Sequence, residues 1–181
     1  TAASSSTFWR GDGTWVAPSG GGKVLQVVST TLTSSVTESI AGNSLSTGTV
    51  AGFTATITPA ATSSKVLVLI NTQFGYSSAG GGDSTGFLIK RDSTVICVGD
   101  AAGSRISTTA TESLRSVSQQ LNLGANYLDS PSTTSATTYY ITFYNGSGST
   151  RDVWLNQSDS DPDADYAQRT ASTMTLMEIG A

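Results

Sequence analysis

The sequence predicts an all-β protein built as an antiparallel sandwich of two sheets. Ser, Thr, Gly and β-branched residues dominate it, and these residue types favour strands and turns over helices. No long stretch places apolar residues at the i, i+3, i+4, i+7 spacing of an amphipathic helix. Short runs typical of strands are instead separated by turn-forming residues, and this spacing indicates eight or nine strands with a jelly roll as the leading topology. A chain of 181 residues is long enough for one such domain with a sizeable core.

The strands expected in the first half of the chain end at recognisable turns. They lie at Lys23–Thr30, Val50–Thr58, Lys65–Tyr76 and Gly86–Arg91, and the last pairs with Thr94–Val98. Thr58-Pro59 ends one strand, and Arg91-Asp92-Ser93 forms the turn of the expected hairpin.

The segment Val66-Leu-Val-Leu-Ile70 is apolar on both faces of its pleat. A strand tolerates this pattern when one face meets the core and the other meets a second buried surface. We expect that surface to be another subunit of a homotrimer. The alternative is cover by a loop or by the N-terminal arm of the same chain.

The strands expected in the second half lie at Glu112–Leu123, Thr138–Asn145, Asp152–Asn156 and Ser172–Ile179. Turns are indicated by Ser130-Pro131, Asn145-Gly-Ser-Gly148 and Asp161-Pro162. Within the second of these strands, Tyr139, Ile141 and Phe143 share the expected core face. Tyr140, Thr142 and Tyr144 share the other face, which is solvent-exposed or interfacial.

An aromatic segment precedes the expected sandwich. Residues 7 to 18 run Thr-Phe-Trp-Arg-Gly-Asp-Gly-Thr-Trp-Val-Ala-Pro, and a Ser-Gly-Gly-Gly stretch follows. Gly11 or Gly13 can adopt positive φ in a tight turn, and Asp12 can accept hydrogen bonds from nearby backbone amides. Three large rings cannot bury themselves in so short a piece, so they need a partner surface. We therefore divide the chain into an extended arm, residues 1–22, and a sandwich domain, residues 23–181.

This arm resembles the Phe-x-Arg-Gly-Asp-Gly-Thr-Trp boundary element of tailed-bacteriophage tail fibres, which often precedes a C-terminal head. One departure is Trp9, which stands where a smaller aliphatic residue is expected. The resemblance continues through Lys23-Val-Leu-Gln-Val-Val28, Thr56-Ile-Thr-Pro59, Ser63-Ser-Lys-Val-Leu-Val-Leu69, Val98-Gly-Asp-Ala-Ala-Gly-Ser-Arg105 and Ser172-Thr-Met-Thr-Leu-Met-Glu-Ile-Gly-Ala181.

The resemblance implies a homotrimeric, receptor-binding head at the host-facing, extracellular end of a virion tail fibre. Its expected partner is a bacterial cell-surface glycan or an outer-membrane protein, bound noncovalently. The chain begins with Thr1 and has methionine only at 174 and 177, so we expect a preceding region that attaches to other virion tail proteins.

Composition argues against several other classes of function. The net charge of −4 provides no basic field for nucleic acid, and no apolar stretch is long enough to insert into a membrane. The chain has no histidine, so catalytic triads with histidine and histidine-bound zinc are excluded. Cys97 is the only cysteine and is expected to be a buried thiol. We expect no enzyme activity, no cofactor and no metal site.

The acidic stretch Asp159-Ser-Asp-Pro-Asp-Ala-Asp165 raises two alternatives. Paired carboxylates could serve a glycosidase, although no repetitive scaffold is present to build a long substrate groove. The spacing also resembles the start of a calcium loop, but Ala164 and Thr170 stand where that loop needs Gly and Glu. A solvated acidic loop is the preferred interpretation.

Receptor binding is expected from loop tips and from one tryptophan. In Asp152-Val-Trp-Leu-Asn156, alternation places Trp154 on a polar face where its ring could stack on a sugar, or pack under a loop or a subunit. The candidate loops run from Tyr76 to Asp83, from Asp100 to Arg105 and from Asn156 to Tyr166. The candidate residues are Tyr76, Asp83, Asp100, Arg105, Trp154, Asn156, Asp161, Asp163 and Tyr166. A purely structural capping or trimerisation domain is the competing hypothesis, and a polysaccharide depolymerase is the third.

Overall fold

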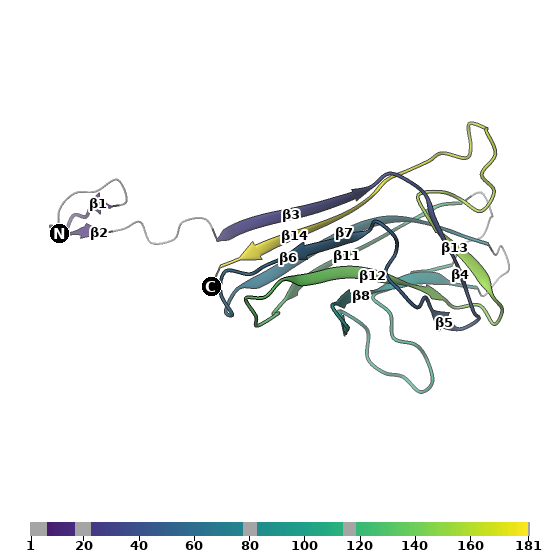
Figure 1. Ribbon diagram of the computed structural model, residues 1–181, viewed down its shortest axis with the longest axis horizontal. Helices are drawn as coiled ribbons and strands as arrows, with labels where there is room; N and C mark the ends of the chain where they lie inside the picture. The colour runs from purple at the N-terminus through teal and green to yellow at the C-terminus, as the bar shows by residue number, and fades with distance from the viewer. Residues whose placement is uncertain (1–6, 17–22, 78–82, 114–118, 181) are drawn as a thin grey trace.

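The computed structural model describes residues 7–16, 23–77, 83–113 and 119–180, and all regular structure in them is β-strand (Figure 1). The strands are β1 (Phe8–Trp9), β2 (Trp15–Val16), β3 (Val24–Leu32), β4 (Val36–Ile40), β5 (Ser44–Leu45), β6 (Thr54–Ile57), β7 (Lys65–Tyr76), β8 (Thr85–Arg91), β9 (Thr94–Ile96), β10 (Ala110–Glu112), β11 (Leu121–Asp129), β12 (Thr137–Asn145), β13 (Arg151–Leu155) and β14 (Ser172–Ile179). These residues contain no helix long and apolar enough to cross a membrane.

Two antiparallel sheets form the sandwich that the sequence predicted. The β7 sheet contains β3, β4, β7, β11, β13 and β14, and the β8 sheet contains β5, β6, β8, β9, β10 and β12. The pairs β3–β14, β6–β12, β7–β11 and β8–β10 are nested, so that the first of these eight strands pairs with the last and the fourth with the fifth. This nesting is the order of a jelly roll, in which one long hairpin is rolled into two sheets.

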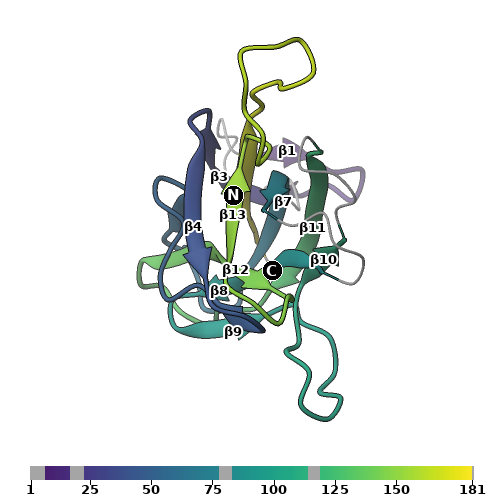
Figure 2. The ribbon, with the colours of Figure 1, turned by 90° about the vertical axis from the view of Figure 1, so that its right-hand side faces the viewer.

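Two neighbouring strands on one side of the β7 sheet are interrupted midway. β3 continues as β4 and β13 continues as β14, so the β3–β14 pair is followed along the sheet by a β4–β13 pair. Residues 33–35 separate β3 from β4, and the longer 156–171 loop separates β13 from β14. Figure 2 shows this loop projecting beyond the sheet, next to the end of β13.

The core lies between the sheets and is rich in aromatic rings. The ring of Phe74 in β7 stacks on Phe87 of β8 with centroids 5.9 Å apart and meets Phe143 of β12 edge-on at 5.4 Å. Tyr139, Ile141 and Phe143 are fully buried in this core, as predicted from their alternation. Burying such rings supplies the main driving force that joins the two sheets.

A buried ion pair also links the sheets. Asp129 of β11 accepts two hydrogen bonds of 2.8 Å from the guanidinium of Arg91 in β8. The same carboxylate accepts a 2.7 Å hydrogen bond from the hydroxyl of Tyr139 in β12. Burial and the neighbouring Asp129 raise the pKa of Tyr139, which therefore stays protonated and donates to the carboxylate.

Most strands predicted for the sandwich are confirmed, but one is misplaced and two strands of the sandwich are missed. The strand expected at Glu112–Leu123 is wrong, because β10 ends at Glu112 and β11 begins only at Leu121, while residues 114–118 lie outside the described part. Pairing with β7 carries β11 on to Asp129. The short strands β4 and β5 were not expected, and Val50–Thr58 is strand only in β6 because Gly52 adopts φ +73° in a preceding turn.

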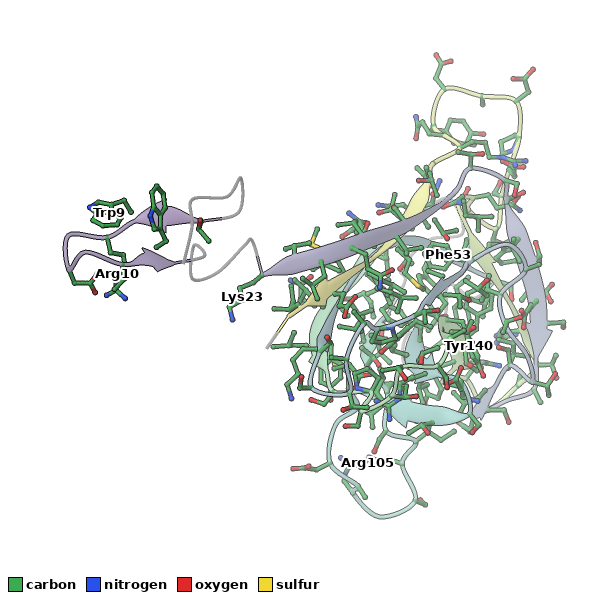
Figure 3. The ribbon with its side chains drawn as sticks, turned by 60° about the vertical axis from the view of Figure 1, so that its left-hand side comes forward. Trp9, Arg10, Lys23, Phe53, Arg105 and Tyr140 are labelled. Atoms are coloured by element: carbon green, nitrogen blue, oxygen red, sulfur yellow. The ribbon has the colours of Figure 1, made fainter. Side chains whose placement is uncertain are left out.

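The N-terminal arm contains a small hairpin in which β1 and β2 pair only with each other. The amide of Gly13, at φ +82°, donates to the Arg10 carbonyl, and Asp12 accepts from the Thr14 amide at 3.1 Å. Both parts of the predicted turn are thus confirmed. Trp9 and Trp15 meet edge-on at 5.4 Å, yet Trp9 stays 58% exposed (Figure 3). The arm therefore retains apolar surface that its own hairpin does not cover.

Candidate functional site

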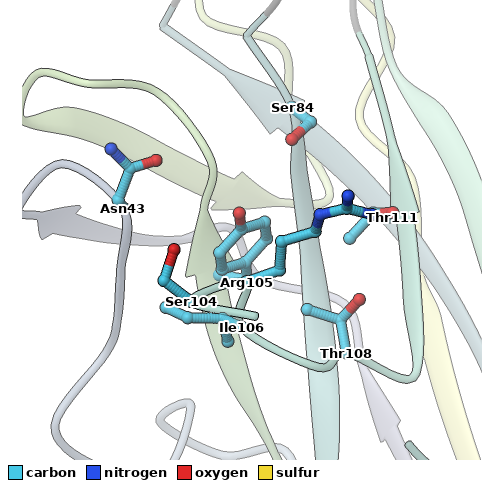
Figure 4. Close-up of a pocket in the computed structure, with 8 residues that line it drawn as sticks. Asn43, Ser84, Ser104, Arg105, Ile106, Thr108 and Thr111 are labelled. Atoms are coloured by element: carbon cyan, nitrogen blue, oxygen red, sulfur yellow. The ribbon is translucent and has the colours of Figure 1, made fainter. Parts of the chain in front are cut away.

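A pocket of about 510 Å³ lies on the outer face of the β8 sheet (Figure 4). Its lining comes from five separate parts of the chain. The lining residues are Asn43, Ser84, Ser104, Arg105, Ile106, Thr108, Thr111 and Tyr144. This volume falls within the range of ligand-binding pockets in proteins.

The floor of the pocket follows from strand register. Tyr144 of β12 lies opposite Gly86 of β8, which lies opposite Thr111 of β10, so the three residues form one row across the outer face. A Cβ atom on Gly86 would come 2.0 Å from the Ala110 carbonyl oxygen. Glycine is thus required here, because the backbone of β10 lies over this position.

One wall of the pocket is the 97–109 loop, which projects from the sandwich in Figure 3. Hydrogen bonds hold both ends of this loop. The Gly99 amide donates to the Thr108 carbonyl at 3.3 Å, and the Thr109 amide donates to the Phe87 carbonyl at 2.9 Å. Gly103, at φ +64°, forms the turn that presents Arg105 to the pocket.

Arg105 differs from the other arginines that the structure describes. Four of them pair with aspartates, in the pairs Arg10–Asp12, Arg91–Asp129, Arg151–Asp83 and Arg169–Asp161. Within the described residues, the Arg105 guanidinium has no hydrogen bond or ion pair, and no carboxylate lines its pocket. In Figure 4 its side chain extends across the pocket towards Thr111. The pocket therefore combines an unpaired cation with neutral hydrogen-bonding groups.

Two candidate binding residues prove to be structural. Tyr76 is fully buried and donates a hydrogen bond to the side chain of Asn145, and burial together with Asp83 raises its pKa to about 12. Asn156 is also fully buried, and its amide donates to the Leu32 carbonyl at 2.8 Å and to the Ser34 carbonyl at 3.0 Å. Neither side chain is open to a ligand at the surface of this chain.

Of the alternatives given for Trp154, the structure agrees with packing under a loop and not with an open sugar-binding face. Only 8% of Trp154 is exposed, and Val153, Leu155 and Asn156 beside it are fully buried. The chain turns back at Asn156, which has positive φ. The carbonyl oxygen of Gln157 then lies so close to Gly75 that a Cβ atom on Gly75 would be only 2.2 Å from it. Because Gly75 is the cross-strand partner of Trp154, the following loop packs over this part of the sheet.

The 156–171 loop holds the remaining acidic candidates. Asp161 forms a two-point ion pair with Arg169, whose guanidinium also donates to the Ser35 hydroxyl at 3.0 Å. Asp163 lines a second pocket together with Asp161 and Arg169. Tyr166 in the same loop is 62% exposed. No three carboxylate or thiol side chains in the described residues lie close enough to share a metal ion.

Asp83 and Asp100 lie at separate places on the surface. Asp83 forms an ion pair with Arg151 at 3.3 Å, and residues 78–82 of its loop lie outside the described residues. Asp100 belongs to the same loop as Arg105 but does not line the pocket. Among the predicted residues, the structure therefore places only Arg105 in the pocket over the β8 sheet. The other lining residues were not predicted as site residues, although Tyr144 was predicted to lie on the face of its strand away from the core.

The lone thiol is not activated. Cys97 is half-buried against the core, and burial raises its pKa. A raised pKa keeps the group as a thiol, which is a poor nucleophile.

The outer face of the β7 sheet is apolar at one end. Register aligns Val27, Met177, Leu67 and Leu128 in one row across β3, β14, β7 and β11, which we call the apolar row. Val27 and Leu128 are 55% and 53% exposed, while Leu67 and Met177 between them are half-buried. Further along the sheet the same face becomes polar, with Thr31, Thr173, Asn71 and Gly124 in one row.

Comparisons with known proteins give no further assignment. A scan against protein-family models finds no matching family. A search of curated proteins finds no matching sequence. The resemblance to tail-fibre heads therefore remains a prediction from the residues quoted for it.

Proposed function

We propose that this chain is the host-facing head of a bacteriophage tail fibre and attaches noncovalently to a bacterial surface receptor as a homotrimer. The main support for this proposal is the apolar row on the outer face of the β7 sheet. The jelly-roll order and the aromatic arm that resembles a tail-fibre boundary element support the same conclusion.

The apolar row fits contact with other copies of the chain. Its two end members are more than half exposed, although leucine and valine side chains gain about 1.5–3 kcal/mol each on full burial. The exposed Val24 and Leu25 at the start of β3 extend this surface. Three β7 sheets packed around an axis would bury these side chains together, and this would account for the two-sided pattern of β7.

Such an assembly leaves the β8 sheet free for a receptor. The two sheets of a sandwich turn their outer faces in opposite directions, so the pocket around Arg105 would face outwards on each subunit. Three such sites on one rigid head bind a repetitive cell surface by avidity even where each contact is weak. Several fibres on one virion multiply this effect.

The test is binding of the fluorescently labelled chain to a panel of bacterial strains. We expect the wild type to label a subset of strains, and Val27→Asp, which places a charge in the apolar row, to lose most labelling because avidity is lost. Val95→Asp is the matched control, since Val95 is 40% exposed on β9 of the other sheet.

Two results would contradict the attachment role. A trimer that labels no strain in a broad panel supports the competing hypothesis of a capping domain. Release of reducing ends from host polysaccharide supports a depolymerase.

A further inference from the structure

We propose that the pocket around Arg105 binds the anionic group of an acidic saccharide, such as the carboxylate of a uronic acid or the phosphate of a sugar phosphate. This inference rests on the proposed attachment to a bacterial surface and names the chemistry of the receptor. It concerns one site in each chain.

The charge of the pocket selects for an anion. Arg105 is the only charged residue in the lining, and its guanidinium is unpaired among the described residues. The guanidinium carries several N–H donors in a planar fork that matches the oxygens of a carboxylate or phosphate. The guanidinium cation makes the site positive, while the whole chain carries a net charge of −4.

The remaining lining selects for a hydroxylated ligand. Five neutral side chains supply hydroxyl or amide groups, namely Asn43, Ser84, Ser104, Thr108 and Thr111. Each can donate and accept hydrogen bonds, as the hydroxyls of a sugar ring require. The ring of Tyr144 adds an aromatic surface of the kind that packs against the apolar face of a sugar.

The backbone around the pocket is fixed before any ligand arrives. A Cβ atom on Gly146 would come 2.2 Å from the Ser84 hydroxyl oxygen and 2.9 Å from the Tyr144 hydroxyl oxygen. The amide of Gly146 donates to the Ser84 carbonyl at 2.8 Å, and the Asn43 amide donates to the Ser147 carbonyl at 2.7 Å. These bonds hold three walls of the pocket together, so little ordering is needed on binding.

The experiment is a ligand-observed NMR titration of the full chain with five probes. They are D-glucuronic acid, D-galacturonic acid and glucose 6-phosphate, with D-glucose and D-galactose as neutral partners. We expect at least one acidic probe to bind measurably more tightly than its neutral partner. The relative affinities of uronic acid and sugar phosphate decide between the two sources of the anion.

The variants test whether Arg105 causes this preference. Arg105→Gln should weaken binding of the preferred acidic probe about tenfold or more, because a charged hydrogen-bonded contact is lost. Arg105→Lys should retain part of the affinity, since it keeps the charge but loses the fork. Lys23→Gln removes an equal charge from an exposed site at the start of the sandwich and should change nothing. Thermal melting checks that each variant is folded.

The outcomes separate this inference from the proposed function. Equal binding of acidic and neutral probes, no binding at all, or full affinity in Arg105→Gln would overturn the acidic-saccharide site, even if the chain labels bacteria. Selective, Arg105-dependent binding of an acidic probe would support the site. If the chain then labelled no bacteria, the attachment role alone would fail.

Discussion

Asn156 is predicted to be one of the most important polar residues for the stability of the sandwich. It sits where β13 ends and the chain leaves the sheet, at φ +66°. Its amide nitrogen donates to Leu32 and Ser34 across the break between β3 and β4, and its oxygen accepts from the Ser172 hydroxyl at 2.7 Å. This one side chain thus joins the two interrupted strands at the edge of the β7 sheet.

The expected cost of Asn156→Ala can be worked out from these contacts. The Leu32 carbonyl and the Ser172 hydroxyl belong to buried residues and would lose their hydrogen bonds at about 1–3 kcal/mol each before relaxation. The carbonyl of Ser34 belongs to an exposed residue, so its lost hydrogen bond should cost less. Alanine in the left-handed region adds about 1 kcal/mol. Allowing for partial relaxation, we expect a loss of about 3–6 kcal/mol in the free energy of unfolding, a large part of the stability of a typical domain.

The assay is urea unfolding at one fixed protomer concentration, so that association does not alter the comparison. Asn43→Ala isolates the backbone cost, because Asn43 also has positive φ, at 51°, but its side chain is exposed. Asn156→Gly relieves the backbone while still losing the hydrogen bonds. If Asn156→Ala lost no more stability than Asn43→Ala, the hydrogen-bonding role would be refuted.

Two further predictions concern packing and pH. Gly86→Ala should lower the free energy of unfolding by more than about 1 kcal/mol, because its Cβ would meet the backbone of β10; Gly48→Ala, which has open space around it, is the control, and equal melting temperatures would refute the close approach. Burial opposes ionisation of Glu178, but hydrogen bonds from Gln26, Ser64 and the Ala60 amide outweigh it and lower the Glu178 pKa below its ordinary value of 4.5. A lowered pKa in the folded state means that the carboxylate stabilises the fold at neutral pH and loses this effect as the pH falls below 4.5. The wild type should therefore exceed Glu178→Gln in stability at pH 7, with the gap closing in acid, and a gap independent of pH would contradict this.

Local patterns in the sequence were sufficient to predict much of the framework. The apolar run in β7 and the alternation in β12 were sufficient to predict both strands, and the alternation also predicted the core face of Tyr139, Ile141 and Phe143. The turn at Asp92, with φ 50°, and the hairpin it closes were likewise predictable from local chemistry. These elements follow from neighbouring residues alone.

Features that depend on distant residues were not predictable. β11 contains Gly124 and Asn126, which look like strand breakers, but residue-by-residue pairing with β7 keeps them in the strand. Local alternation placed Asn156 and Trp154 on a polar face, whereas long-range hydrogen bonds hold Asn156 inside the fold and a loop covers Trp154. The lining of the Arg105 pocket comes from five segments, and only the folded chain brings these together.

The central claim is that copies of this chain associate through the outer face of the β7 sheet to form the head of a fibre. The measurement that tests it most directly is the molar mass of the full chain by light scattering, compared with Val27→Asp and Val95→Asp. The wild type and Val95→Asp should have three times the 18.5 kDa mass of the chain, and Val27→Asp should have a lower mass. A mass of 18.5 kDa for the wild type, or an intact trimer in Val27→Asp, would contradict it.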